Sequence, residues 1–192
     1  MKSPHHSHIY IYDRERNEVV VIDSQTGEEI ERREDHLTGI LNYLQEKGWD
    51  TAMRKFAVWC AHQTDTEWKP LVYKIFELAE QAIHGKAARD DLKGLYDETE
   101  GEAVSSDTVK LQIESRKAAT FLAARACINP DPFQAALEAS RYHKLWAELD
   151  FKDQEHDLPD EDLDRAARDM QLTINQQQID HLLDLITQKL DA

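Results

Sequence analysis

Two runs of apolar residues between positions 51 and 86 repeat at the three-and-four spacing of a helix with one buried face. The first run contains Met53, Phe56, Ala57, Cys60 and Ala61, and the second contains Leu71, Ile75, Leu78, Ala79 and Ile83. Residues 64–66 between them are typical helix-capping residues, and Pro70 suits the first turn of a new helix. The pattern predicts an antiparallel helical hairpin that needs further helices to cover it.

Before this hairpin, the side chains alternate in type with a period of two residues, which is typical of β-strands. β-Branched and aromatic residues dominate residues 8–13 and 19–23, which predicts two strands. Gly27 suits a turn before a third strand at residues 28–33. We therefore expect a short antiparallel β-meander at residues 1–34, with a charged third strand at its edge that buries at most Ile30.

Helical spacing returns at residues 37–47 and, after a weak stretch at 92–96, at residues 107–128. The alanine-rich segment 107–128 is expected to be the central buried helix. Pro130 and Pro132 separate it from a helix that reaches about Leu149. The sequence thus predicts an α+β fold, mostly α, with about seven helices: a β-meander at 1–34, a helical bundle at 35–149, and an acidic linker with a C-terminal helical pair (162–170 and 174–190) at 150–192.

Acidic residues outnumber basic ones strongly in this chain of 192 residues, which has a formal net charge of −15 and a pI near 4.9. Such a field repels nucleic-acid phosphates and anionic lipids, so direct binding to either is disfavoured and a basic partner protein is favoured. No apolar window is long enough to span a bilayer, and no secretion signal is recognisable. With only two cysteines, both in predicted helices, a cytoplasmic protein with reduced thiols is expected.

The excess negative charge is concentrated in two segments. Residues 90–107 hold seven carboxylates and one lysine, and residues 148–164 hold nine carboxylates and one lysine, which together supply 14 of the 15 excess charges. These segments are either solvated loops or an acidic docking surface that imitates nucleic-acid phosphates. Residues 153–164 also carry carboxylates at EF-hand spacing, but Leu158 replaces the required glycine and Pro159 stiffens the loop, so a calcium site is disfavoured.

Motifs for catalysis or cofactor binding are absent: the sequence has no Walker A motif, dinucleotide fingerprint, nucleophile elbow or zincin motif. Glu77 and Glu80 share a helix face, so a metal-dependent nucleotide hydrolase stays open as an alternative. A scaffold subunit of a larger complex is a third possibility. His5, His6 and His8 are interpreted as a polar terminal segment, because no further ligand lies beside them. We expect no cofactor and no bound metal.

Three segments carry a resemblance to a known family: MRKFAVWCAHQ, KIFELAEQAIHGKAARDDL and AATFLAARACINPDPFQAALEAS. Over residues 51–146 this pattern resembles the helical immunity proteins of bacterial toxin systems. The resemblance implies a protein that binds and neutralises another protein, and it carries over no site residues.

Together these features predict a non-enzymatic, acidic protein that binds and inhibits a basic, nucleic-acid-handling partner, either as a toxin immunity protein or as a phage anti-defence or anti-CRISPR protein. Exposed aromatic residues are the usual anchors of such contacts. The expected partner-binding residues are Trp68, Asp97, Glu98, Glu100, Glu102, Trp146, Asp153, Glu155, Asp157, Asp160 and Glu161.

Overall fold

The computed structural model describes residues 8–13, 18–23, 26–34, 36–64, 70–101, 116–154 and 159–190. Within these residues the chain is mostly helical, which confirms that part of the prediction. The chain divides into two compact units, residues 1–40 and residues 41–192. The boundary falls inside helix α1 (His36–Glu46).

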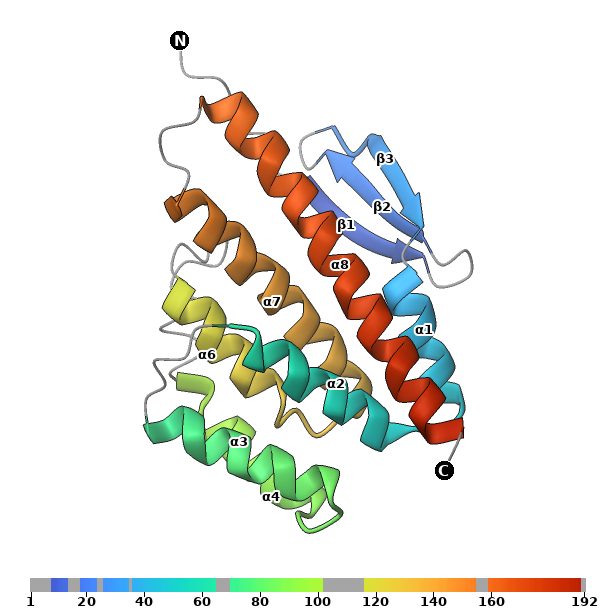
Figure 1. Cartoon of the computed structure of the whole chain (residues 1–192), viewed down its shortest axis with the longest axis vertical. Helices are drawn as coiled ribbons and strands as arrows, with labels where there is room; N and C mark the ends of the chain where they lie inside the picture. Colours follow the sequence, from blue (N-terminus) through green and yellow to red (C-terminus); the bar gives the residue numbers. More distant parts are fainter. Residues whose placement is uncertain are drawn as a thin grey trace. The chain divides into compact units, whose positions relative to one another are not determined.

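The first unit contains three strands, β1 (His8–Asp13), β2 (Glu18–Asp23) and β3 (Glu29–Glu34). They pair antiparallel in the order β1-β2-β3, and the register between β2 and β3 shifts between Val21 and Ile22 (Figure 1). Glu29, the first residue of β3, is exposed, and the other strand side chains, including those of His8 and Ile30, are not described. His5 and His6 lie outside the described residues.

The second unit is a helical bundle. After the end of α1 it contains α2 (Asp50–His62), α3 (Pro70–Ile83), α4 (Arg89–Glu98), α6 (Arg116–Ala126), α7 (Pro132–Gln154) and α8 (Asp160–Leu190). Helix α2 packs against α3, α6, α7 and α8, and α7 lies between α6 and α8 (Figure 1). The helical hairpin predicted from residues 51–86 corresponds to α2 and α3.

Helix α6 lies within the predicted segment 107–128 and is largely buried against α2, α3 and α7, and residues 107–115 lie outside the described residues. Two predictions about the helices are wrong. Helix α7 extends to Gln154, beyond the predicted end at Leu149. The predicted C-terminal pair is the single helix α8, because no glycine or proline interrupts residues 160–190.

Small side chains allow the central helices to approach closely. Alanines account for most of the buried positions of α6 and α7 and for several in α2. The completely buried alanines are Ala57, Ala61, Ala119, Ala123, Ala135, Ala136 and Ala139. A close approach brings many backbone and side-chain atoms into van der Waals contact, so an alanine-rich interface can still be well packed.

Hydrogen bonds from and to polar side chains hold the turn between α6 and α7 in place. The Asp131 carboxylate accepts hydrogen bonds from the backbone N–H groups of Phe133 and Gln134, which makes Asp131 the N-cap of α7 with Pro132 at the first helical position. The buried Arg54 of α2 donates to the carbonyl oxygens of Asn129 and Pro130, each at 3.1 Å. Burial lowers the pKa of Arg54, while Asp50 and Asp131 oppose this shift.

Replacing Arg54 by methionine should lower the free energy of unfolding by about 2–4 kcal/mol, because two partly buried carbonyl groups lose a charged donor. Urea denaturation followed by circular dichroism would measure the change. Lys55→Met, at the exposed neighbouring position, is the matched control and should change the stability by no more than about 0.5 kcal/mol. Equal effects of the two substitutions would show that the Arg54 contacts contribute nothing specific.

Candidate partner-binding site on helix α4

Helix α4 presents an acidic outer surface while its inner side packs into the bundle. Leu92 and Leu95 are buried, and α4 packs against α3. The exposed carboxylates of α4 and the residues after it are Asp90, Asp91, Asp97, Glu98 and Glu100, which we call the α4 acidic surface. Three of the predicted partner-binding residues, Asp97, Glu98 and Glu100, are thus brought together here.

The C-terminal end of α4 is fixed to α6 by Arg125. The guanidinium carbon of Arg125 lies 3.6 Å from the centroid of the Tyr96 ring, close enough for a cation–π interaction. The same group donates hydrogen bonds of 3.1 Å to the Thr99 hydroxyl and to the backbone oxygen of Tyr96. Because Arg125 satisfies a carbonyl at the helix end, the residues that follow α4 are held in a defined place.

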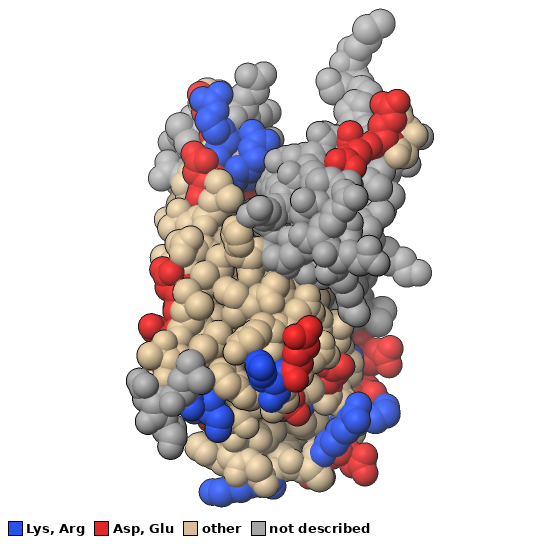
Figure 2. Space-filling view, turned by 90° about the vertical axis from the view of Figure 1, so that its right-hand side faces the viewer, with Lys and Arg blue, Asp and Glu red and all other residues tan. Residues whose placement is uncertain are grey.

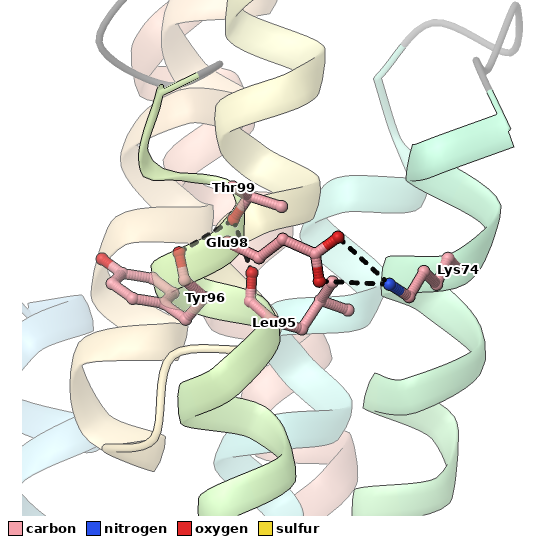
Figure 3. A network of polar contacts seen from close by, with 5 residues as sticks. All are labelled: Lys74, Leu95, Tyr96, Glu98 and Thr99. Carbon is pink, nitrogen blue, oxygen red and sulfur yellow. Dashed lines mark hydrogen bonds and ion pairs between the residues drawn. The ribbon is translucent and has the colours of Figure 1, made fainter.

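A second set of contacts fixes the same turn from the other side (Figure 3). The buried Thr99 hydroxyl lies within hydrogen-bonding distance of the backbone oxygens of Leu95 and Tyr96, at 3.0 and 2.9 Å. Lys74 of α3 forms an ion pair with Glu98 at 3.2 Å. Both side chains of this pair are more than half exposed, so it contributes little stability but restricts where the Glu98 carboxylate lies.

The negative charge at the end of α4 opposes the helix dipole. Asp90 and Asp91 lie in the first turn, where a carboxylate is favourable, and Asp91 accepts a hydrogen bond from the backbone N–H of Ala88. Asp97 and Glu98 lie in the last turn, which has no basic residue and where a carboxylate is unfavourable. Asp97 forms an i,i+4 ion pair with Lys93 at 2.5 Å, and this hydrogen bond raises the pKa of Lys93. Such exposed pairs compensate only in part, so the helix dipole does not explain these acidic residues.

Gly94 in the middle of α4 is also unexplained by the fold. A Cβ atom built at this exposed position would meet no atom within 4 Å, and its backbone does not have a positive φ. Glycine inside a helix costs roughly 1 kcal/mol relative to alanine. A missing side chain on an exposed helix surface is what a closely approaching second molecule requires.

The second acidic segment lies elsewhere, and its carboxylates in α7 are paired within the chain. Arg116, the first residue of α6, forms ion pairs with Asp150 and Asp153 of α7, whereas α4 contacts Arg125 in the last turn of α6. The two segments thus contact opposite ends of α6, about 14 Å apart along its axis. Glu148 pairs with Lys152. Figure 2 likewise shows basic side chains beside acidic ones on the face that it draws.

Several predicted residues fall outside what the structure describes. Glu102, Glu155, Asp157 and Trp68 lie outside the described ranges, and Asp160 and Glu161 begin α8 with side chains that are not described. The EF-hand-like spacing at 153–164, which the sequence already disfavours as a calcium site, includes most of these residues, and α7 continues through Gln154. Trp146 of α7 is half-buried, and its indole nitrogen is buried without a hydrogen-bond partner in the described part of the chain.

The described residues include few groups suited to catalysis. Glu77 and Glu80 are both exposed on α3. Among the described residues no group of three or more histidine, cysteine, aspartate or glutamate side chains is placed to hold a metal ion. Cys60 and Cys127 are free and buried, and burial raises the pKa of both thiols, which makes them poor nucleophiles.

Sequence reasoning missed the residues that hold the end of α4. Arg125 is the single charged residue of the run AATFLAARA, and a lone charge in an alanine-rich helix was the available signal. Its partners Tyr96 and Thr99 are distant in sequence and carry no motif that links them to it.

Comparison with known protein families, with curated proteins and with solved structures finds no match to this chain. Among the described helices, none is long and apolar enough to cross a membrane.

Gly94→Ala should raise the free energy of unfolding by about 0.5–1 kcal/mol, since alanine is the better helix former and the added methyl group meets only open space. Gly48→Ala is the contrasting control, because Gly48 has a φ of +66° and a substitution there is strained. Urea denaturation of both variants would show opposite signs. Destabilisation by Gly94→Ala would mean that the glycine serves the fold itself.

Proposed function

We propose that this protein is a non-enzymatic inhibitor that binds a basic, nucleic-acid-handling partner protein through the α4 acidic surface. Toxin immunity and phage anti-defence or anti-CRISPR activity are both forms of this function. The carboxylates of Asp97, Glu98 and Glu100 occupy a cationic site on the partner and compete with the phosphates that it normally binds.

The observation that carries the proposal is the fixed, electrostatically unfavourable end of α4. Carboxylates that oppose the helix dipole lower stability. Arg125 nevertheless holds the end of the helix through the Tyr96 carbonyl and the Thr99 hydroxyl, and Lys74 pairs with the Glu98 carboxylate. Charges held in position before binding lose less entropy when they meet a partner. Gly94, with open space around it, leaves room for that partner to approach the helix backbone.

The segment 148–164 has a smaller part in this proposal. Asp150 and Asp153 share the half-buried Arg116, whereas the partners of Asp97 and Glu98 are the exposed lysines Lys93 and Lys74, whose pairs are weaker and easier for a partner protein to replace. We assign to this segment long-range attraction, which depends on net charge more than on fixed geometry.

A charge-reversal pair tests the proposal with a matched control. Asp97→Lys with Glu100→Lys removes charge from the α4 acidic surface, and Asp180→Lys with Asp184→Lys makes the same net change at exposed positions of α8. The partner is the protein that the immobilised wild-type chain retains from a host lysate. Reversal on α4 should weaken its binding about 100-fold or more, because like charges then face each other, and should abolish inhibition of its nucleic-acid activity.

The control pair on α8 should lower affinity only about three-fold, through the change in net charge. Wild-type affinity should also fall as salt rises from 50 to 300 mM. Equal weakening by the two variants would show that net charge alone drives binding, and affinity independent of salt would contradict the role of the carboxylates.

A further inference from the structure

A buried polar contact joins α8 to α7. Gln178, in the middle of α8, is completely buried, and its amide nitrogen donates to the backbone oxygen of Ser140 at 3.0 Å. The same nitrogen lies 3.2 Å from Nδ1 of the buried His143. Because an amide N–H can only donate, Nδ1 of His143 is the acceptor and the imidazole is neutral.

An aromatic contact joins α8 to α2 at the same level. The Trp59 ring of α2 is stacked on the His181 ring of α8, with centroids 4.3 Å apart and planes inclined by 15°. Trp59 also meets His143 edge-on at 5.9 Å, and Phe56 stacks on both Trp59 and His181. Two histidines therefore lie at the point where α8 meets the other two helices.

We propose that Gln178, His143, Trp59 and His181 form an acid-sensitive latch, in which protonation of His143 releases α8 from α7 and α2. We call these four residues the α8 latch. The inference does not depend on the inhibitor function proposed above.

Protonation removes the acceptor that Gln178 uses. An imidazolium carries N–H groups on both nitrogens, so Nδ1 would face the Gln178 nitrogen donor to donor. The Gln178 side-chain oxygen has no hydrogen-bond partner in the described residues, but turning the amide to offer this oxygen to His143 would also turn it against the Ser140 carbonyl. The closed arrangement therefore accepts only neutral His143.

The charged groups around the latch do little to stabilise a protonated histidine in the closed state. On α7, the Lys144 ammonium disfavours a second positive charge at His143. On α2, the nearest titratable groups in sequence to Trp59 are Cys60, a buried thiol with a raised pKa, and His62. On α8, Asp180 and Asp184 flank His181, and Asp184 favours its protonated form only in part.

The sign of the pH effect follows from the lowered pKa values. Burial, with a smaller contribution from Lys144, lowers the pKa of His143 to about 4, and burial also lowers the pKa of His181. A histidine released to solvent has a pKa near 6.5, so the open state binds more protons than the closed state between pH 6.5 and 4. The closed state is favoured above pH 6.5 and becomes less favoured as pH falls. His143 alone would raise the opening constant about 30-fold between pH 7.5 and pH 5.

Amide hydrogen exchange measured by mass spectrometry tests the latch in the full chain. After correction for intrinsic exchange rates, the amide protection of peptides around Gln178 in α8 should be about 30-fold lower at pH 5 than at pH 7.5. Peptides of α2 should keep their protection. Unchanged α8 protection, or an equal loss of protection in α2, would overturn the proposal.

His143→Asn keeps an acceptor near the Nδ1 position and cannot be protonated in this range, so the acid response of its α8 should fall about 30-fold, to the part that His181 supplies. His84→Asn, at an exposed turn position, is the matched control and should retain the wild-type response. An acid response in His143→Asn equal to that of wild type would overturn the proposal. NMR of the histidine rings tests the proposal on the wild-type protein alone. A protonated His143 at pH 5, in molecules whose α8 amides stay protected, would also overturn the proposal.

Discussion

The close packing of α2, α6 and α7 through alanine side chains is the constraint on which the rest of the bundle depends. Helices this close cannot shift without steric overlap, so the two ends of α6 have fixed surroundings. Arg125 near one end holds α4, and Arg116 at the other end holds the last turns of α7. The distribution of acidic residues over the bundle follows from this arrangement.

The paired carboxylates at 150–153 and at the end of α4 differ in their partners, among the residues that the structure describes. Asp150 and Asp153 pair with Arg116 of α6 and so link two helices of the core, whereas Asp97 and Glu98 pair with exposed lysines. Those at the end of α4 lie against the helix dipole beside a glycine that the fold does not require. These carboxylates lower the stability of the helix, yet they are held in place. Binding surfaces often combine these two properties, because residues there are selected for recognition and not for stability.

Local sequence patterns predicted most of the helices because each has a clear apolar stripe or a capping signal, as in α2, in α3 and at Asp131–Pro132 before α7. They misjudged α8, whose glutamine-rich middle has a weak apolar pattern and buries Gln178. For the candidate site, charge counting predicted Asp97, Glu98 and Glu100 as partner-binding residues, and this stays a prediction. It could not show that Arg125 fixes them or that Asp153 is paired, because both contacts join residues about 25 to 40 positions apart.

Carboxylate footprinting of the complex is the most direct test of the central claim that the end of α4 meets the partner. The free protein and its complex would be labelled with a carbodiimide and a small amine, and each carboxylate would be read out by peptide mass spectrometry. We expect labelling of Asp97, Glu98 and Glu100 to fall several-fold in the complex, while Asp180 and Asp184 are labelled as in the free protein. Unchanged labelling on α4, with protection on α8 instead, would contradict the account.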